Sequence, residues 1–245
     1  PRTKKSKHQL GSSPFPGHPH PTPAETSQIA TLLREHHGAA VRPPILQPSL
    51  TVTGCGEVPL VLDALIRTII SSNTSTANSA VALAGIVAAY GSKDGTINYD
   101  AIHERPVEDL EAAMRRAGLA TIKSKNIKAI LTEVAASPSH QPDTPLIQSL
   151  EHLRDLPTTE VMSALMSYKG VGVKIAACVC LFCLQRPVLA IDTHCYRMAR
   201  FLGWIPEGAS VDDTFWHLDA VVGDEWKYEL HELFMKHGQT CEKCS

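Results

Sequence analysis

The sequence predicts an all-α protein. Apolar residues recur at helical spacing through most of the 245-residue chain, glycine and proline mark the ends of these segments, and no segment shows the alternation of a β-strand. Hydrophobic residues make up 43% of the chain and charged residues 20%, which is ordinary for a globular protein. This length and composition allow one large domain or two smaller lobes with a buried core.

The start of the chain differs from the rest. Residues 1–24 are rich in proline, serine, histidine and lysine and lack apolar periodicity, which predicts a disordered tail. A basic cluster in this tail is typical of a nuclear address or a DNA-binding arm, and equally of a solvated tail: Arg2, Lys4, Lys5 and Lys7. No apolar run reaches membrane-spanning length and no signal peptide is visible, so we expect no membrane partner and a nuclear location, with mitochondria as the alternative.

In the first half of the chain, helices are indicated by apolar spacing and by residues that suit their ends. Residues 58–70 and the alanine-rich residues 76–90 carry apolar side chains at helical spacing. Pro106 suits the first position of a helix, and Gly118 suits the stop that follows it. Residues 122–134 form an amphipathic helix, and its polar face is expected to carry three lysines: Lys123, Lys125 and Lys128.

In the second half, further helices are expected over 145–155, 159–168, 175–184, 193–202, 211–222 and 225–237. Residues 175–184 are apolar all round and should be buried. The three cysteines in this segment are interpreted as buried helix residues rather than metal ligands: Cys178, Cys180 and Cys183. The odd total of seven cysteines and the lack of a secretory signal favour a reducing compartment over a disulfide framework.

The most informative part of the sequence is a glycine-containing turn. A helix ends at Tyr168, the turn Lys169-Gly170-Val171-Gly172 follows, and the next helix begins around Lys174. Glycines one residue apart allow positive φ and close backbone approach. The N–H groups at the start of the next helix are a ready site for a DNA phosphate. On its own, the turn is equally typical of a connector without catalytic meaning.

Lys174 and Asp192 are the candidate catalytic residues. The positive end of a helix and partial burial both destabilise an ammonium, which would lower the lysine pKa and leave the neutral amine that a Schiff-base nucleophile needs. A carboxylate held beside it could accept its proton and stabilise positive charge on a sugar. The alternatives are a surface lysine that binds phosphate and, for Asp192, an ordinary helix cap.

The run from Gly170 through Lys174 to Asp192-Thr193-His194 resembles the helix-hairpin-helix, Gly/Pro-rich, Asp superfamily of DNA glycosylases, and most closely its endonuclease III branch. That family has a Gly-Val-Gly-x-Lys turn and, eighteen residues after the lysine, an aspartate in a Val-Asp-Thr-His context. The similarity covers about residues 57–244. It implies two helical lobes with a DNA-binding cleft between them, one formed by 57–186 and the other by 25–56 with 187–245.

The resemblance also implies roles for individual residues. Lys174 would attack C1′ of the damaged nucleotide, and Asp192 would be the essential acidic residue. Gly170 and Gly172 would shape the phosphate-binding hairpin, whose carbonyls in this family can also hold a monovalent cation. Phosphate contacts are expected from four basic residues, namely Lys169, Lys123, Lys125 and Arg197. Because the formal net charge is only −2, DNA binding must depend on such local placement.

Two further positions match loops that fill the space left by an extruded nucleotide. Asn73 lies where the family usually has a glutamine, and Leu119 lies where an apolar wedge separates the bases. Without the resemblance we would interpret them as a polar loop residue and a capping hydrophobe. The family's usual Leu-Pro before the hairpin is Tyr168-Lys169 in this chain, which places the choice of substrate in doubt.

The C-terminal residues depart from the family pattern. His237 to Cys241 match the approach to an iron–sulfur loop that normally supplies four cysteines, but this sequence has only Cys241 and Cys244 there. Two thiolates cannot hold a four-iron cluster unaided, and a two-cysteine zinc site would lack ligands. Either the sequence is cut short or this lineage has lost the cluster. The spacing of this first cysteine pair already differs from the pattern, so loss is the favoured interpretation, and no cofactor is expected to be needed for the chemistry.

These observations predict a base-excision-repair enzyme, a DNA glycosylase with AP lyase activity. It would act as a monomer on duplex DNA and remove an oxidised pyrimidine through a lysine Schiff base and β-elimination. One alternative is a glycosylase for 5-methylcytosine or T·G mismatches, because Gly203-Trp204-Ile205-Pro206 and the region of Cys178 resemble plant 5-methylcytosine glycosylases. Another is a DNA-binding module that uses the hairpin without catalysis.

Overall fold

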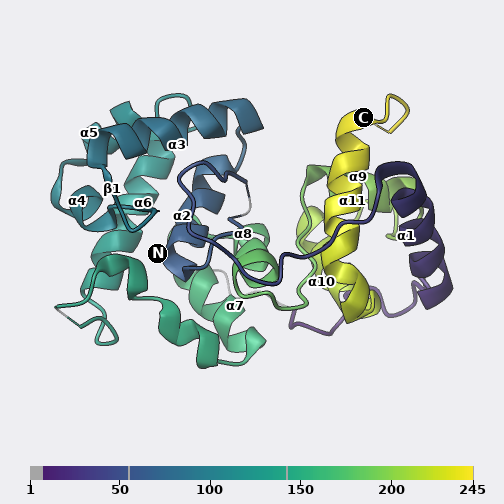
Figure 1. Ribbon diagram of the computed structural model, residues 1–245. Helices are drawn as coiled ribbons and strands as arrows, with labels where there is room; N and C mark the ends of the chain where they lie inside the picture. The colour runs from purple at the N-terminus through teal and green to yellow at the C-terminus, as the bar shows by residue number, and fades with distance from the viewer. Residues whose placement is uncertain (1–7, 55, 142, 245) are drawn as a thin grey trace. The chain divides into compact units, whose positions relative to one another are not determined.

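The computed structural model describes residues 8–54, 56–141 and 143–244, and most of these residues are helical (Figure 1). A short antiparallel hairpin pairs β1 (Ser92–Lys93) with β2 (Thr96–Ile97). Because helices dominate and each of these strands has only two residues, the predicted all-α class is confirmed. Within the described residues, no helix combines the length and the apolar character that crossing a membrane requires.

The chain forms two compact units, which we describe separately. The contiguous unit runs from Ile45 to Gln185, and the discontinuous unit combines the residues up to Pro44 with those from Arg186 onward. The sequence instead predicts that residues 45–56 belong to the discontinuous domain. That boundary is wrong because a buried arginine of the contiguous unit, Arg67, donates hydrogen bonds to the backbone carbonyls of Ser49 and Val52.

The contiguous unit is built around one central helix, α2 (Val61–Ser71), in which every residue from Val61 to Ile70 is buried. The other helices of this unit are α3 (Thr76–Tyr90), α4 (Tyr99–Glu104), α5 (Val107–Ala113), α6 (Ala120–Ala135), α7 (Thr158–Ser167) and α8 (Val173–Cys178). Helix α2 contacts α3, α6 and α8. Its buried Arg67 and Asp63 form an ion pair at 2.7 Å, so each charge has an opposite partner inside the core.

The end of α8 continues into the π-helical turn η3 (Val179–Cys183), and all residues from Ile175 to Cys183 are buried. The predicted burial of this segment and of its three cysteines is confirmed. Burial raises the pKa of the Cys183 thiol to about 12, so this side chain is held as the neutral thiol. Residues 145–155, predicted as one helix, instead form two 3-10 turns, η1 (Leu146–Gln148) and η2 (Glu151–Asp155).

In the described part of the discontinuous unit, the helical elements are α1 (Pro23–His37), α9 (Thr193–Phe201), α10 (Val211–Val221), the 3-10 turn η4 (Asp224–Trp226) and α11 (Lys227–Thr240). Helix α11 packs against both α1 and α9 (Figure 1). Between α10 and α11, the buried Asp219 accepts a hydrogen bond from the Leu189 N–H at 2.8 Å and pairs with Lys227 at 3.2 Å. The packing of α1 on α11 joins the two chain segments of this unit, and the buried contacts of Asp219 hold the second segment together.

The prediction of a disordered tail over 1–24 is wrong for residues 8–24, while the basic cluster at positions 2–7 lies outside the described residues. The Ser13 hydroxyl hydrogen-bonds to Nδ1 of the buried His217 at 2.6 Å, and Nε2 of that ring donates to the His20 carbonyl at 2.7 Å. Helix α1 then starts with a capping box between Thr22 and Glu25. The contacts of Ser13 and His20 depend on His217, about 200 residues away, so apolar periodicity could not reveal them.

Candidate DNA-binding and catalytic site

A tight hairpin joins α7 to α8, as the sequence predicts. The Val171 N–H donates to the Tyr168 carbonyl at 3.1 Å, and Gly172 is the N-cap of α8. Gly170 has φ +83°, and a Cβ there would lie 2.1 Å from Nδ2 of Asn126 on α6. A Cβ on Gly172 would meet nothing within 4 Å. The first glycine is therefore required for backbone conformation and packing, whereas the second keeps the start of α8 accessible.

Lys174 lies in the first turn of α8, one residue after Val173, and its side chain is partly buried. Its position follows from the hairpin, because the turn ends at Gly172 and α8 becomes fully buried from Ile175 onward. Lys169, in the turn itself, is exposed. Lys169 is therefore a surface lysine, whereas Lys174 is a half-buried lysine at the start of a helix.

Asp192 is the N-cap of α9, and its carboxylate accepts a hydrogen bond from the Cys195 N–H at 2.7 Å. Burial alone would raise the pKa of this carboxyl, but the charge of His231 and the hydrogen bond from Cys195 together lower it below its ordinary value. The side chain is therefore a fixed carboxylate at neutral pH. Lys174 belongs to the contiguous unit and Asp192 to the discontinuous unit, so the contacts and burial of each residue are described within its own unit.

Asn73 and Leu119 lie on two loops of the contiguous unit, and both are exposed with left-handed backbone, at φ 48° and 60°. The Gly118 N–H donates to the Thr74 hydroxyl at 3.0 Å, and a Cβ on Gly118 would lie 2.3 Å from the Asn73 carbonyl oxygen. The two loops therefore touch directly. Strained non-glycine residues are maintained where the surrounding structure fixes them, and they concentrate at functional sites.

Lys123 is not on the polar face of its helix, so that prediction is wrong. Its side chain is 4% exposed, and its ammonium donates to the carbonyls of Ile70 and Ser72 and to the hydroxyl of Thr74. Burial lowers the pKa of Lys123 to about 8. Since its donors face the protein interior, Lys123 positions the two loops and is not a phosphate contact. Its neighbour Lys125 is exposed, as predicted.

Arg197 lies on α9 and is partly buried. One of its η nitrogens donates to the Gly238 carbonyl at 2.7 Å and lies 3.2 Å from Nδ1 of His194. The guanidinium therefore joins α9 to the end of α11. Its proposed contact with a DNA phosphate stays a prediction, and the structure shows an additional packing role that the sequence did not suggest.

Cysteine side chains lie at the end of α11, where the sequence resembles the approach to an iron–sulfur loop. Among the described residues, the cysteines at this end are Cys241 and Cys244, and the remaining described cysteines are buried elsewhere. The structure does bring His237 to this pair, with one ligand atom from each of the three residues within 4.8 Å of the others. His36 and His37 of α1 lie against His237, and local sequence spacing could not indicate that these three histidines come together.

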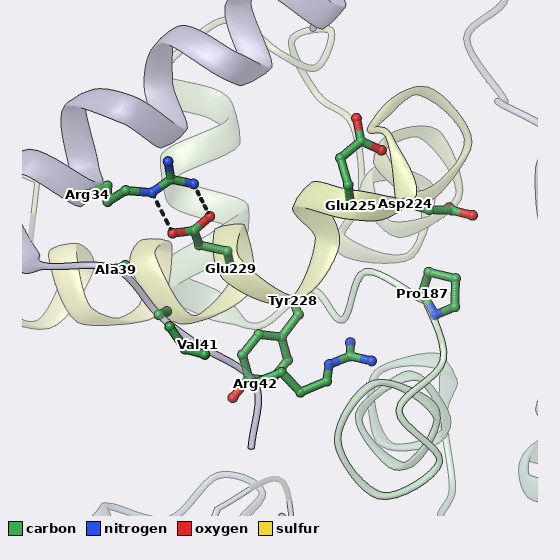
Figure 2. Close-up of a pocket in the computed structure, with 10 residues that line it drawn as sticks. Arg34, Ala39, Val41, Arg42, Pro187, Asp224, Glu225, Tyr228 and Glu229 are labelled. Atoms are coloured by element: carbon green, nitrogen blue, oxygen red, sulfur yellow. Dashed lines mark hydrogen bonds and ion pairs between the residues drawn. The ribbon is translucent and has the colours of Figure 1, made fainter. Parts of the chain in front are cut away.

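The discontinuous unit also has a surface pocket of about 570 Å³, shown in Figure 2. Arg34 pairs with Glu229 on one side of it, and the Arg42 guanidinium lies 4.7 Å from the centre of the Tyr228 ring. None of the predicted catalytic or DNA-binding residues lines this pocket. The chemistry suggested by the sequence is therefore not located there.

Comparisons with known proteins agree with this geometry. Residues 66–222 match the HhH-GPD superfamily of base excision DNA repair proteins. The chain is 32% identical over 252 residues to an Arabidopsis thaliana protein named Putative DNA glycosylase At3g47830, covering 96% of this chain and 82% of that protein. It is 28% identical to Arabidopsis DNA glycosylase/AP lyase ROS1, but this match covers 52% of the chain and only 9% of ROS1.

Solved structures show the same fold. An endonuclease III–DNA complex superimposes with a TM-score of 0.66 at 19% sequence identity, covering 89% of this chain and 86% of that one. The resemblance that the hairpin and the aspartate indicated is thereby confirmed. The family match covers more than half of the chain and includes the hairpin, Lys174 and Asp192. The chain belongs to the HhH-GPD superfamily of base excision DNA repair proteins.

Proposed function

We propose that this protein is a DNA glycosylase with AP lyase activity, that Lys174 is its nucleophile, and that Asp192 is its essential carboxylate. The observation that carries the proposal is the position of Lys174 in the first turn of α8, immediately after the Gly170–Gly172 hairpin. The hairpin N–H groups suit a phosphate of the DNA backbone. A lysine fixed beside them is suited to reach the sugar next to that phosphate.

In the proposed reaction, the neutral Lys174 amine attacks C1′ of the target nucleotide and the bond to the base breaks, with the electron pair leaving on the base. The amine nitrogen then loses a proton, and the C1′–O4′ bond breaks as the imine forms at C1′. O4′ takes the electron pair of the broken bond together with that proton, which opens the sugar ring. Loss of a C2′ proton then expels the 3′ phosphate by β-elimination. The Asp192 carboxylate, ionised because its pKa is lowered, stabilises the positive charge that develops on the sugar.

The paired loops supply the step that makes the base accessible. Leu119, 56% exposed, enters the stack as an apolar wedge, and Asn73 takes the place of the extruded nucleotide. Exposed lysines at positions 125 and 169 contact phosphates, so DNA affinity falls with rising salt. The partner is duplex DNA with a damaged base, bound by a monomer in the nucleus.

The proposed substrate is an oxidised pyrimidine, and the second candidate is 5-methylcytosine or the thymine of a T·G mismatch. The names of two relatives favour lyase activity, since ROS1 is called a DNA glycosylase/AP lyase and the Arabidopsis OGG1, 30% identical over 144 residues, an N-glycosylase/DNA lyase. These two matches cover 9% and 38% of the relatives' lengths. They therefore support the chemistry but do not choose between the substrates.

Borohydride trapping tests the proposal. Duplexes containing thymine glycol, 5-methylcytosine, a T·G mismatch or an abasic site are incubated with the protein, and borohydride reduces any imine to a stable adduct. We expect an adduct with the thymine glycol and abasic duplexes, lost in Lys174→Ala and kept in the matched control Lys93→Ala, whose side chain is exposed on β1. Base release without an adduct would show a monofunctional glycosylase, and binding without turnover would show a DNA-binding module.

A further inference from the structure

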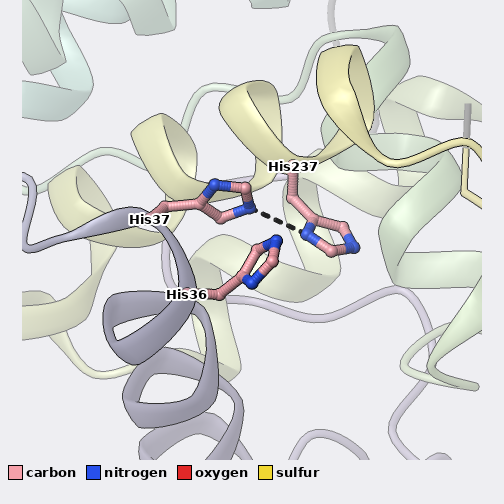
Figure 3. Close-up of side chains that lie close together, drawn as sticks. All are labelled: His36, His37 and His237. Atoms are coloured by element: carbon pink, nitrogen blue, oxygen red, sulfur yellow. Dashed lines mark hydrogen bonds between the residues drawn. The ribbon is translucent and has the colours of Figure 1, made fainter.

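A cluster of metal-ligating side chains lies in the discontinuous unit, where the last turn of α1 meets the end of α11. His36, His37 and His237 approach one another, and Nε2 of His37 lies 2.9 Å from Nδ1 of His237 (Figure 3). One ligand atom from each of these three residues lies within 4.8 Å of the others. The same limit holds for a second group, His237 with Cys241 and Cys244, so His237 belongs to both.

The C-terminal turn presents its first cysteine to a cation. The Cys244 N–H donates to the Cys241 carbonyl at 3.1 Å and closes the turn. The N–H groups of Lys243 and Cys244 also hydrogen-bond to the Cys241 sulfur, so the turn closes around this side chain.

We propose that His237, Cys241 and Cys244 bind one zinc ion, and that a histidine of the α1 pair, His36 or His37, supplies the fourth ligand. Zinc prefers four nitrogen and sulfur ligands in a tetrahedron, with bonds of about 2.0–2.3 Å. Such bonds place neighbouring ligand atoms roughly 3.3–3.8 Å apart. Within the group of His237, Cys241 and Cys244 the ligand atoms already lie within 4.8 Å of one another, so they need to approach by only about 1 Å. The fourth ligand comes from the second group, which shares His237.

This site differs from an iron–sulfur centre in its donor set, since it combines two thiolates with imidazoles. Its consequence is structural, because the ion would cross-link α1 to the turn after α11, positions about 200 residues apart in sequence. Ligands from distant segments stabilise a fold when the metal binds only the folded chain. The proposal does not depend on the glycosylase chemistry, because none of its ligands is a predicted catalytic residue.

Metal content tests the site directly. The 245-residue chain, expressed with added zinc and passed through a desalting column, should retain close to stoichiometric zinc by elemental analysis. Cys241→Ser and Cys244→Ser should each lower the zinc affinity about 10-fold or more. The matched control is His152→Gln, which changes an exposed histidine outside the cluster. Zinc retained equally by both cysteine variants, or no zinc in the wild-type chain, would overturn the proposal.

Cobalt substitution identifies the ligands without relying on stability. Cobalt added to the chelated protein should give the ligand-field bands of a tetrahedral ion and a thiolate-to-cobalt charge-transfer band. The charge-transfer band should weaken in each cysteine variant, while the double variant His36→Gln/His37→Gln should shift the ligand-field bands. An unchanged spectrum in the double variant would refute the fourth ligand. Circular dichroism of the chelated variants should show native helix content, which separates lost binding from lost folding.

Discussion

Nζ of Lys123 lies 2.7 Å from the hydroxyl oxygen of Thr74, and this hydrogen bond joins the first turn of α6 to the loop after α2. The same ammonium also donates to the carbonyls of Ile70 and Ser72. One buried cation therefore holds together the two loops that carry Asn73 and Leu119. Their relative position depends on this side chain rather than on either loop's own sequence.

The first prediction concerns this buried lysine. Lys123→Met keeps a long apolar side chain but leaves buried acceptors unpaired, so the free energy of unfolding should fall by about 2–4 kcal/mol. Denaturant titration measures this change. Lys125→Met is the matched control on the adjacent, exposed position, and its stability should stay within about 0.5 kcal/mol of wild type while its DNA affinity becomes less sensitive to salt. Equal stability of both variants would contradict the positioning role.

The second prediction tests whether Leu119 contributes to base release without contributing to the stability of the fold. Leu119 is 56% exposed, so Leu119→Ala should change the free energy of unfolding by less than about 0.5 kcal/mol. Base release from duplex DNA should nevertheless slow by roughly tenfold or more, because the vacated stack is no longer filled. Single-turnover kinetics measure the effect. Val81→Ala, at a residue 52% exposed on α3, is the control and should leave the rate unchanged.

The third prediction uses the two hairpin glycines as a matched pair. Gly170→Ala forces a side chain onto Asn126 at φ +83°, so it should cost about 1–3 kcal/mol of stability and weaken DNA binding. Gly172→Ala enters open space and should leave the melting temperature almost unchanged. The double variant Gly170→Ala/Asn126→Ala should recover part of the lost stability by removing the clash. A melting temperature in Gly172→Ala as low as in Gly170→Ala would contradict this account.

The sequence was sufficient for features that depend on local spacing. Helix α3 was predicted at 76–90 and occurs over Thr76–Tyr90, because its alanine-rich apolar run is bounded by Ser75 and Gly91. The hairpin and the cap at Asp192 were likewise visible, since glycine and aspartate have few other reasons to occur at such positions.

Features that depend on distant partners could not be predicted. The amphipathic pattern of 122–134 gave no reason to bury Lys123, because its acceptors belong to the loop some fifty residues earlier. The two faces of α1 differ little in hydrophobicity, and the burial of this helix depends on its packing against α11. The histidines of α1 gained meaning only when the fold placed them beside His237.

The fourth prediction concerns acid stability. The Glu25 carboxylate accepts hydrogen bonds from the Thr22 N–H at 2.6 Å and from His20 at 2.8 Å, and these contacts lower its pKa from 4.5 to about 2. A carboxyl with a lowered folded-state pKa stabilises the fold above its unfolded pKa, and this contribution is lost as the pH falls from about 4.5 toward 2. Glu25→Gln should therefore lose less stability across this window than wild type, as measured by thermal unfolding. Glu35→Gln, on the exposed face of α1, should behave as wild type.

The last prediction separates the two roles of Asp192. Asparagine caps a helix about as well as aspartate, so Asp192→Asn should keep the hydrogen bond to the Cys195 N–H and lose less than about 1 kcal/mol of stability. It removes the negative charge, however, and base release should slow by about 100-fold or more because the developing positive charge is no longer stabilised.

Asp192→Ala provides the contrast, since it removes both the cap and the charge and should lower stability by about 1 kcal/mol as well. Single-turnover base release and thermal unfolding, measured on both variants, distinguish the roles. If Asp192→Asn released the base at the wild-type rate, the carboxylate would act only as a cap. Because Asp192 is already hydrogen-bonded as a cap, loss of activity in the stable asparagine variant is the result that ties its charge to the chemistry.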